Sequence, residues 1–74
     1  MTHYLDRLQE EHDDLDGKCK RLKIMVTGHP TFKTLSPDEQ ADLTQQLIVM
    51  TEYRTILEQR MARGRALILG ESSP

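Results

Sequence analysis

A long apolar stripe near the start of the 74-residue chain limits its possible folds more than any other feature of the sequence. Its members recur in alternating steps of three and four residues: Leu5, Leu8, His12, Leu15, Cys19, Leu22 and Val26. This heptad spacing is typical of a helix that packs along its whole length against another helix, and its period excludes a strand. Charged residues fill most of the positions between. The stripe therefore predicts a first helix over about residues 3–27.

The end of this first helix is marked by glycine and proline. Gly28 is predicted to end the helix in a left-handed conformation, and Pro30 follows two residues later. We expect a loop over residues 28–36. Phe32 and Leu35 are apolar residues within it, and we expect them to fold back over the end of the helix pair.

A capping box predicts the start of a second helix. Ser36 stands at the N-cap, Pro37 at the first helical position and Glu39 at the third. This pattern supplies hydrogen-bond partners for backbone N–H groups of the first turn. The predicted helix runs over about residues 37–69, and residues 71–74 are expected to be a flexible tail. Its main stripe is Leu43, Leu47, Met50, Arg54, Leu57, Met61, Gly64 and Ile68, and a second apolar set is Ile48, Val49, Tyr53 and Ile56.

The order of charges favours antiparallel pairing of the two helices. Acidic residues precede basic residues in both predicted helices, so a hairpin places acid beside base at both ends. A register can be proposed in which the residue numbers of each pair of facing residues add to about 65. It predicts the apolar pairs Leu22 with Leu43, Leu15 with Met50, His12 with Tyr53 and Leu8 with Leu57. It also predicts ion pairs, each worth about 0–1 kcal/mol when exposed: Arg7 with Glu58, Glu11 with Arg54 and Lys23 with Asp42.

Such a hairpin is too thin to be stable alone. We expect one domain over residues 1–70, and a chain with no Trp and 4% aromatic residues supplies at most about 3–5 kcal/mol from one core. Cys19 is the only cysteine, and the three histidines lack the spacing of a zinc finger, so neither a disulfide nor a metal is expected. Oligomerisation remains as the expected means of stabilising the hairpin. The fold prediction is an all-α antiparallel coiled-coil hairpin in a homo-oligomer, with the set Ile48, Val49, Tyr53 and Ile56 as the subunit interface.

Several classes of function are disfavoured by composition. The formal net charge of −2 argues against a DNA-binding protein, and no apolar run is long enough for a membrane span. The N-terminus lacks a secretion signal, so a cytoplasmic protein is expected. The four glycines are isolated, and Cys19 and His12 lie on the packing stripe rather than in a catalytic constellation. We therefore expect neither an enzyme nor a bound cofactor.

Two features could bind a ligand. The basic cluster over residues 18–23 is either a solvated helix end or an anion site. Tyr4 lies beside the main stripe and is either a packing residue or a platform for a stacked base. A second group of basic residues near the other end of the chain is likewise either solvated or part of an anion site: Arg60, Arg63 and Arg65.

An ordered set of residues resembles a known family. In the first helix the set is the run Asp6-Arg7-Leu8-Gln9-Glu10-Glu11 with Leu15, Lys18 and Leu22; beyond it the set is Phe32, Leu35, Gln46-Leu47, Met50, Tyr53, Leu57 and Arg60. The pattern, over about residues 4–63, resembles the small phage hairpin proteins related to the anti-CBASS cyclic-oligonucleotide sponge and to the hairpin part of the anti-Thoeris sponge.

The resemblance implies a function and a site. Such sponges bind cyclic nucleotide messengers without cleaving them, and they assemble as hexamers with pockets between subunits. Carried onto this chain, Tyr4 (or His3) would stack on a base of a cyclic dinucleotide and Lys18 would meet a phosphate, with Arg7 one helical turn away. Arg60 would serve a second pocket for cyclic trinucleotides. The protein would then block CBASS-type signalling in the cytoplasm of the host bacterium.

Two other classes of function compete with this interpretation. The stronger is a coiled-coil adaptor or assembly protein that binds a protein partner along the second helix. The weaker is a small nucleic-acid-binding regulator, which the negative net charge and the absence of a three-helix pattern disfavour.

Overall fold

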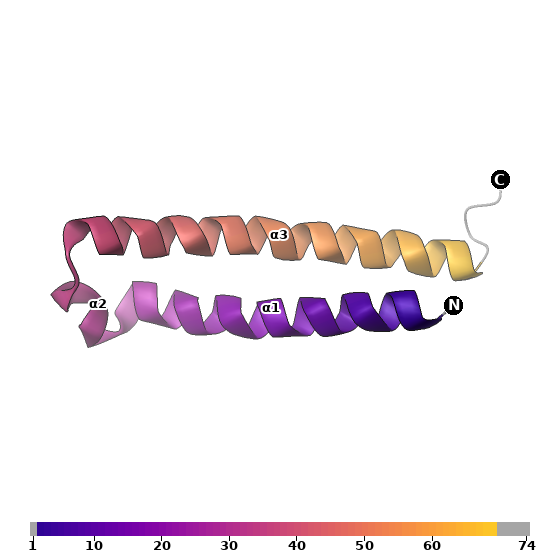
Figure 1. The fold of residues 1–74 in the computed structure, drawn as a ribbon, viewed down its shortest axis with the longest axis horizontal. Helices are drawn as coiled ribbons and strands as arrows, with labels where there is room; N and C mark the ends of the chain where they lie inside the picture. Colours follow the sequence, from indigo (N-terminus) through magenta and orange to yellow (C-terminus); the bar gives the residue numbers. More distant parts are fainter. Residues whose placement is uncertain (1, 70–74) are drawn as a thin grey trace.

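Two long antiparallel helices form the protein. The computed structural model describes residues 2–69, and the side chains of residues 4–67. Helix α1 spans Thr2–Gly28, the short helix α2 spans Pro30–Thr34 and helix α3 spans Pro37–Leu69. Helices α1 and α3 lie side by side along a molecule of 54 × 20 × 15 Å, with α2 at the closed end (Figure 1). The described residues are thus an all-α hairpin, and the predicted tail over residues 71–74 lies outside them.

The end of α1 differs from the prediction for Gly28. This residue is the last of α1, and it does not adopt a left-handed conformation. The break comes one residue later, where His29 is extended (φ −77°, ψ 130°) and directly precedes Pro30. A residue before proline is disfavoured in the helical region, because the proline ring clashes with its backbone. The stop signal is therefore the proline rather than the glycine.

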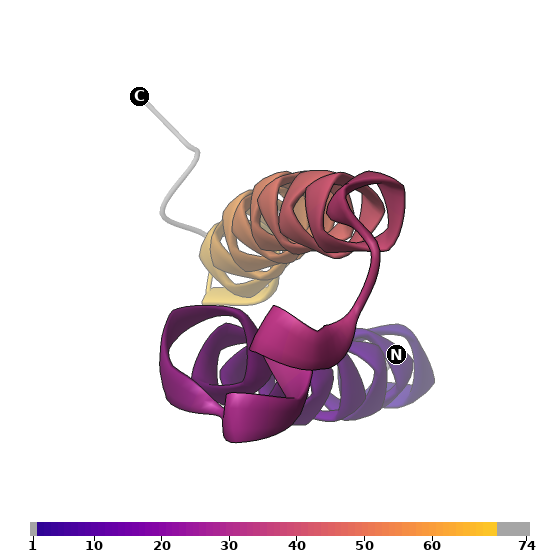
Figure 2. The same ribbon diagram turned by 90° about the vertical axis from the view of Figure 1, so that its left-hand side faces the viewer.

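The predicted loop contains the single-turn helix α2. Pro30 stands at its first position, and the His29 Nδ1 accepts a hydrogen bond from the Thr31 N–H at 3.1 Å. Phe32 and Leu35 are partly buried, and α2 packs against the end of α1, as Figure 2 shows end-on. The expected loop is thus largely a structured cap on the closed end of the hairpin.

The predicted cap of the second long helix is confirmed. Ser36 Oγ accepts a hydrogen bond from the Glu39 N–H at 3.1 Å, and the Gln40 side chain donates to the Leu35 carbonyl at 2.9 Å. These bonds use polar groups that the start of a helix otherwise leaves to solvent.

The core is a single row of side chains between the long helices. Its buried members are Leu8, Leu15, Cys19, Leu57 and Met61, with Leu5 and Met50 packed against them. Leu57 is fully buried, and burial of a leucine contributes about 1.5–3 kcal/mol. Cys19 is 3% exposed, as expected of a packing residue. So few buried side chains make a narrow core, concentrated toward the open end.

The register of the two helices is shifted from the predicted one by about one helical turn. His12 contacts Glu58 rather than Tyr53, with 2.9 Å between Nε2 and Oε2. Arg54 pairs at 2.9 Å with Asp16 rather than with Glu11. Among the described residues none of the three predicted ion pairs forms: Arg7–Glu58, Glu11–Arg54 and Lys23–Asp42.

The prediction was wrong because neither the apolar stripe nor the ion pairs fix the alignment of the helices within one turn. Exposed ion pairs are weak, and a heptad stripe presents a similar apolar face after a slip of one turn. Packing at the open end distinguishes the two registers. A Cβ atom at position 64 would lie only 2.7 Å from Leu5 Cδ2, so the Leu5 side chain occupies the space that Gly64 leaves empty.

Substitution of Gly64 should therefore behave differently from substitution of Gly17. Gly17 lies within α1 and faces only the flexible end of Arg21, so Gly17→Ala should stabilise the helix by about 0.5–1 kcal/mol. Gly64→Ala should lack this gain because Leu5 must move, and Gly64→Val should cost about 1–3 kcal/mol. Chemical denaturation followed by circular dichroism measures all three. Equal stabilisation by alanine at both positions would contradict the contact between Leu5 and Gly64.

Candidate functional site

A small hollow lies at the open end of the hairpin, where the start of α1 meets the last turns of α3. This end pocket has a volume of about 270 Å³ and is lined by Tyr4, Arg60, Arg63, Gly64 and Leu67. The missing side chain at Gly64 lets α1 lie close to α3 here, since a Cβ atom at this position would be 2.7 Å from Leu5 Cδ2 and 3.8 Å from Tyr4 Cε2.

The chemistry of the end pocket is aromatic and cationic. The Arg60 Nη2 donates to the Tyr4 hydroxyl at 3.4 Å, and its Cζ lies 6.0 Å from the ring centroid. Arg63 is one helical turn further along α3 and is exposed. In the described part of the chain, neither arginine forms a salt bridge, and the lining contains no carboxylate. The pocket can therefore offer a ring face and two guanidinium groups to a ligand that carries bases and phosphates.

The structure brings together two residues that the sequence assigned to separate pockets. Tyr4, the candidate for the cyclic dinucleotide, and Arg60, the candidate for the cyclic trinucleotide, are in direct contact. Arg7 is exposed and lies outside the lining of the end pocket. The side chain of His3 lies outside the described residues.

Lys18 is separated from the end pocket. It is exposed on α1 two heptads beyond Tyr4, and therefore on the same flank of the helix. A separation of 14 residues at a rise of 1.5 Å per residue corresponds to about 21 Å along the helix axis. Within one chain, Lys18 and Tyr4 therefore belong to different places on one surface.

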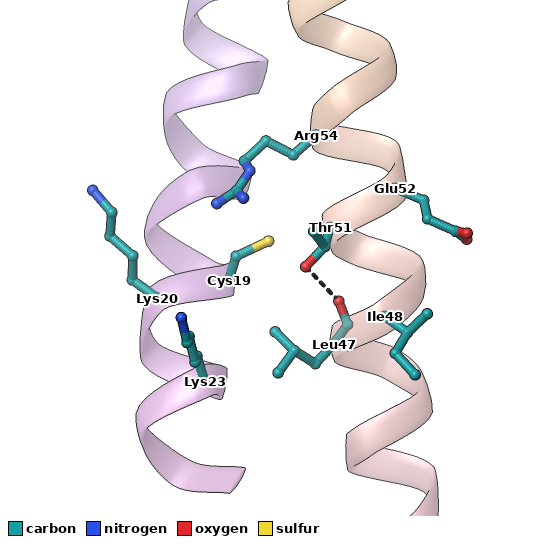
Figure 3. A pocket seen from close by; sticks show the side chains of 8 residues that line it. All are labelled: Cys19, Lys20, Lys23, Leu47, Ile48, Thr51, Glu52 and Arg54. Carbon is teal, nitrogen blue, oxygen red and sulfur yellow. Dashed lines mark hydrogen bonds between the residues drawn. The ribbon is translucent and has the colours of Figure 1, made fainter. Parts of the chain in front are cut away.

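A larger hollow lies between the middle parts of the long helices. This central groove, of about 580 Å³, is drawn in Figure 3 and is lined by Cys19, Lys20, Lys23, Leu47, Ile48, Thr51, Glu52 and Arg54. Its polar groups are mostly engaged elsewhere. Lys20 and Arg54 both pair with Asp16 at 2.9 Å, and the Thr51 hydroxyl donates to the Leu47 carbonyl at 2.8 Å.

The side chain of Glu52 points away from α1 (Figure 3). The central groove therefore presents mainly apolar surface with Lys23 at its edge, and lacks the aromatic face of the end pocket.

His12 links the two helices through polar contacts. Its Nε2 lies 2.9 Å from Glu58, its Nδ1 lies 3.2 Å from Asp13, and its side chain is 16% exposed. The hydrogen bond to Glu58, and then that to Asp13, raise the pKa of His12 above its usual 6.5. The neighbouring charged groups are Asp16, whose pKa is lowered mainly by Lys20, and Arg54, which lies 3.9 Å from Glu58. We call the cluster of His12, Asp13 and Glu58 the polar clamp. The predicted register pairs His12 with Tyr53, whereas the structure pairs it with Glu58.

This clamp predicts a pH dependence of stability. Because the pKa of His12 is higher in the folded state than in the unfolded chain, the imidazolium stabilises the fold fully below about pH 6.5. The contribution is lost as the pH rises through the raised value. The melting temperature of the wild type should therefore fall between pH 6 and pH 9 by more than that of His12→Gln. Parallel melting curves of the two proteins across this range would contradict the assignment.

Large apolar side chains remain exposed on α3. Ile48, Val49, Tyr53 and Ile56, the predicted interface set, are between 41% and 51% exposed. Three of them share a side of the hairpin with the end pocket, because Tyr53 lies one heptad before Arg60, and Val49 and Ile56 lie two and one heptads before Arg63. The exposed surface of Val49, Tyr53 and Ile56, which we call the apolar strip, therefore lies on the same side of the hairpin as the end pocket.

Two searches of the described residues give negative results. No helix there is long and apolar enough to cross a membrane. No group of three or more His, Cys, Asp or Glu side chains in the described part is arranged to hold a metal ion.

Comparison with known families identifies the chain. The Sequestin family model matches residues 2–63. The chain belongs to the Sequestin family. The matched region contains Tyr4, Lys18 and Arg60 and ends at Arg63, so it includes most of the end pocket. No curated protein and no solved structure gives a significant match.

Sequence reasoning found part of this site and missed its geometry. Tyr4 and Arg60 were singled out separately, and Arg63 only as one of several arginines. Gly64 and Leu67 were not recognised as lining a pocket. The signal for Gly64 was its place on the apolar stripe of the second helix, where a residue without a side chain indicates close approach of another element.

Proposed function

We propose that this Sequestin family member is a phage anti-defence protein that binds cyclic oligonucleotide second messengers and sequesters them without cleavage. By holding cyclic dinucleotides, and in a second mode cyclic trinucleotides, it would block CBASS-type immune signalling in the cytoplasm of the host bacterium. The observation that carries the proposal is the end pocket, where the ring of Tyr4 lies against the guanidinium group of Arg60. The family name agrees with a sequestering role.

The chemistry of the pocket suits this class of ligand. A cyclic dinucleotide presents two bases and two phosphates in a compact ring. The face of Tyr4 can stack on a base, because every base has a π-face. Guanidinium groups bind phosphate oxygens through paired N–H donors in a fixed geometry.

Assembly would complete the site. A pocket of about 270 Å³ on the surface of one hairpin is small for a dinucleotide, since ligand pockets are commonly 300–1,000 Å³. A second copy packed on the apolar strip would enclose it and could supply Lys18, which cannot reach Tyr4 of its own chain. We therefore propose a homo-oligomer, with the hexamer of the related sponges as the favoured form.

The first prediction from this function concerns ligand binding. Cyclic dinucleotides should raise the melting temperature, by an amount set by ligand concentration relative to the dissociation constant. Tyr4→Ala and Lys18→Ala should each lose most of this shift at unchanged helical content. Tyr4→Phe, which keeps the ring, should retain much of it, and Lys33→Ala on α2 serves as a control for loss of charge. Ligand released by heat should be intact by mass spectrometry.

Two results would oppose the proposal. Undiminished shifts in both alanine variants would refute the site. The absence of a shift with every cyclic di- and trinucleotide tested would refute the function, and a cleaved product would refute sequestration without hydrolysis.

A second prediction concerns assembly. Light scattering at micromolar concentration should give the mass of an oligomer for the wild type. Val49→Glu combined with Ile56→Glu should reduce that mass, because the double variant places two charges in the proposed apolar contact. The matched double variant Thr44→Glu with Thr55→Glu adds the same charges to exposed polar positions of α3 and should leave the mass unchanged. A monomeric wild type would contradict the proposal.

The apolar strip also favours a second candidate function, a coiled-coil adaptor that binds a protein partner. Exposed apolar residues at heptad spacing are how one helix recognises another. An adaptor would show no thermal shift with any cyclic nucleotide, so the ligand panel separates the two functions.

A further inference from the structure

We infer that Arg63 is a second phosphate-binding residue of the end pocket, and that Arg60 and Arg63 together supply its positive charge from the chain that carries Tyr4. This inference rests on the proposed function and deepens it. It assigns the phosphate contacts nearest the stacked base to two residues of α3, whereas the sequence resemblance placed the phosphate contact of the Tyr4 site at Lys18.

The first argument is the reach of the cations. Lys18 lies about 21 Å along α1 from Tyr4, so it can meet a ligand stacked on Tyr4 only from a neighbouring copy. Arg60 and Arg63 line the same hollow as Tyr4. Two cations of the same chain therefore face the ligand before any neighbour contributes.

The second argument is that Arg60 alone is already partly engaged. Its guanidinium group lies against the Tyr4 ring and donates to the Tyr4 hydroxyl at 3.4 Å, a long bond. This contact fixes the ring beside the pocket and leaves Arg60 with fewer donors for a ligand. Arg63 has no carboxylate partner among the described residues, so its five N–H donors are available for an anion.

The third argument is the position of Arg63 next to Gly64. A Cβ atom at position 64 would lie 2.7 Å from Leu5 Cδ2 and 3.8 Å from Tyr4 Cε2, so the start of α1 and the Tyr4 ring lie close to α3 at this position. Arg63 is the neighbouring residue, one helical turn beyond Arg60. Arginines three residues apart on a helix lie on neighbouring positions of one face, so both can address one ligand. A ligand with two phosphates can thus meet one guanidinium group at each.

The test compares the affinity of variants for defined probes. Isothermal titration calorimetry with 3′,3′-cyclic GMP–AMP, cyclic di-AMP and cyclic tri-AMP is carried out on the 74-residue chain. For the tightest-binding probe, Arg63→Gln should weaken binding about tenfold to hundredfold, the range for loss of a charged hydrogen bond. Arg63→Lys should recover only part of the loss, because an ammonium group lacks the paired donors of a guanidinium group.

The control for loss of charge is Lys33→Gln. Lys33 is an exposed cation of α2 that lines neither the end pocket nor the central groove, and its removal changes the net charge by the same amount. It should keep its affinity within about twofold of the wild type by the same measurement. Circular dichroism and light scattering on each variant show that the fold and the assembly are retained.

The outcomes separate this inference from the proposed function. If the wild type binds none of the three probes, the proposed function fails and the role of Arg63 fails with it. If the wild type binds and Arg63→Gln binds as tightly as Lys33→Gln, only the role of Arg63 is overturned. A loss confined to Arg63→Gln, with partial recovery in Arg63→Lys, supports the inference.

Discussion

The contact of Leu5 with Gly64 is the constraint on which the open end of the molecule depends. A heptad stripe alone permits the two helices to slide by a turn with little change in apolar contact. In the observed register the Leu5 side chain lies against Gly64, a contact that a slip of one turn would lose. In that register Tyr4 reaches Arg60, and His12 reaches Glu58. The Leu5–Gly64 contact, the end pocket and the polar clamp therefore occur together in one register.

Because the chain is small, one surface bears on both the stability of the fold and the proposed binding site. Among the residues whose side chains are described, five are buried and form the core, and a row of this length leaves the apolar strip of α3 in solvent. In the proposed oligomer, the same surface that hides this strip would also enclose the end pocket. Binding sites between subunits let a short chain surround a ligand larger than its own hollow. Tyr4 and Lys18 also lie too far apart along α1 to contact one ligand within a single chain. They can contact the same ligand only when they come from different copies of the protein.

The sequence predicts the helices well because their signals are local. The alternating steps of three and four and the cap at Ser36 define α1 and the start of α3 without knowledge of tertiary contacts. The turn was less predictable. Both Gly28 and Pro30 are helix terminators, and only the backbone shows that the residue before the proline makes the break.

The register and the pocket could not be predicted in the same way. Charge order gives the antiparallel direction, but exposed ion pairs are too weak to fix the alignment within one turn. The family resemblance assigned Tyr4 and Arg60 to different ligands, whereas the structure brings their side chains into contact. The aromatic and basic residues of the site are visible in the sequence, but the side-chain contacts between them are not.

A crystal structure of the assembled protein with a bound cyclic dinucleotide tests the central claim most directly. The account predicts a base of the ligand against the ring of Tyr4 and phosphate oxygens within hydrogen-bond distance of the Arg60 and Arg63 guanidinium groups. A ligand bound in the central groove, or bound with no contact to Tyr4 and α3 at the open end, would contradict it.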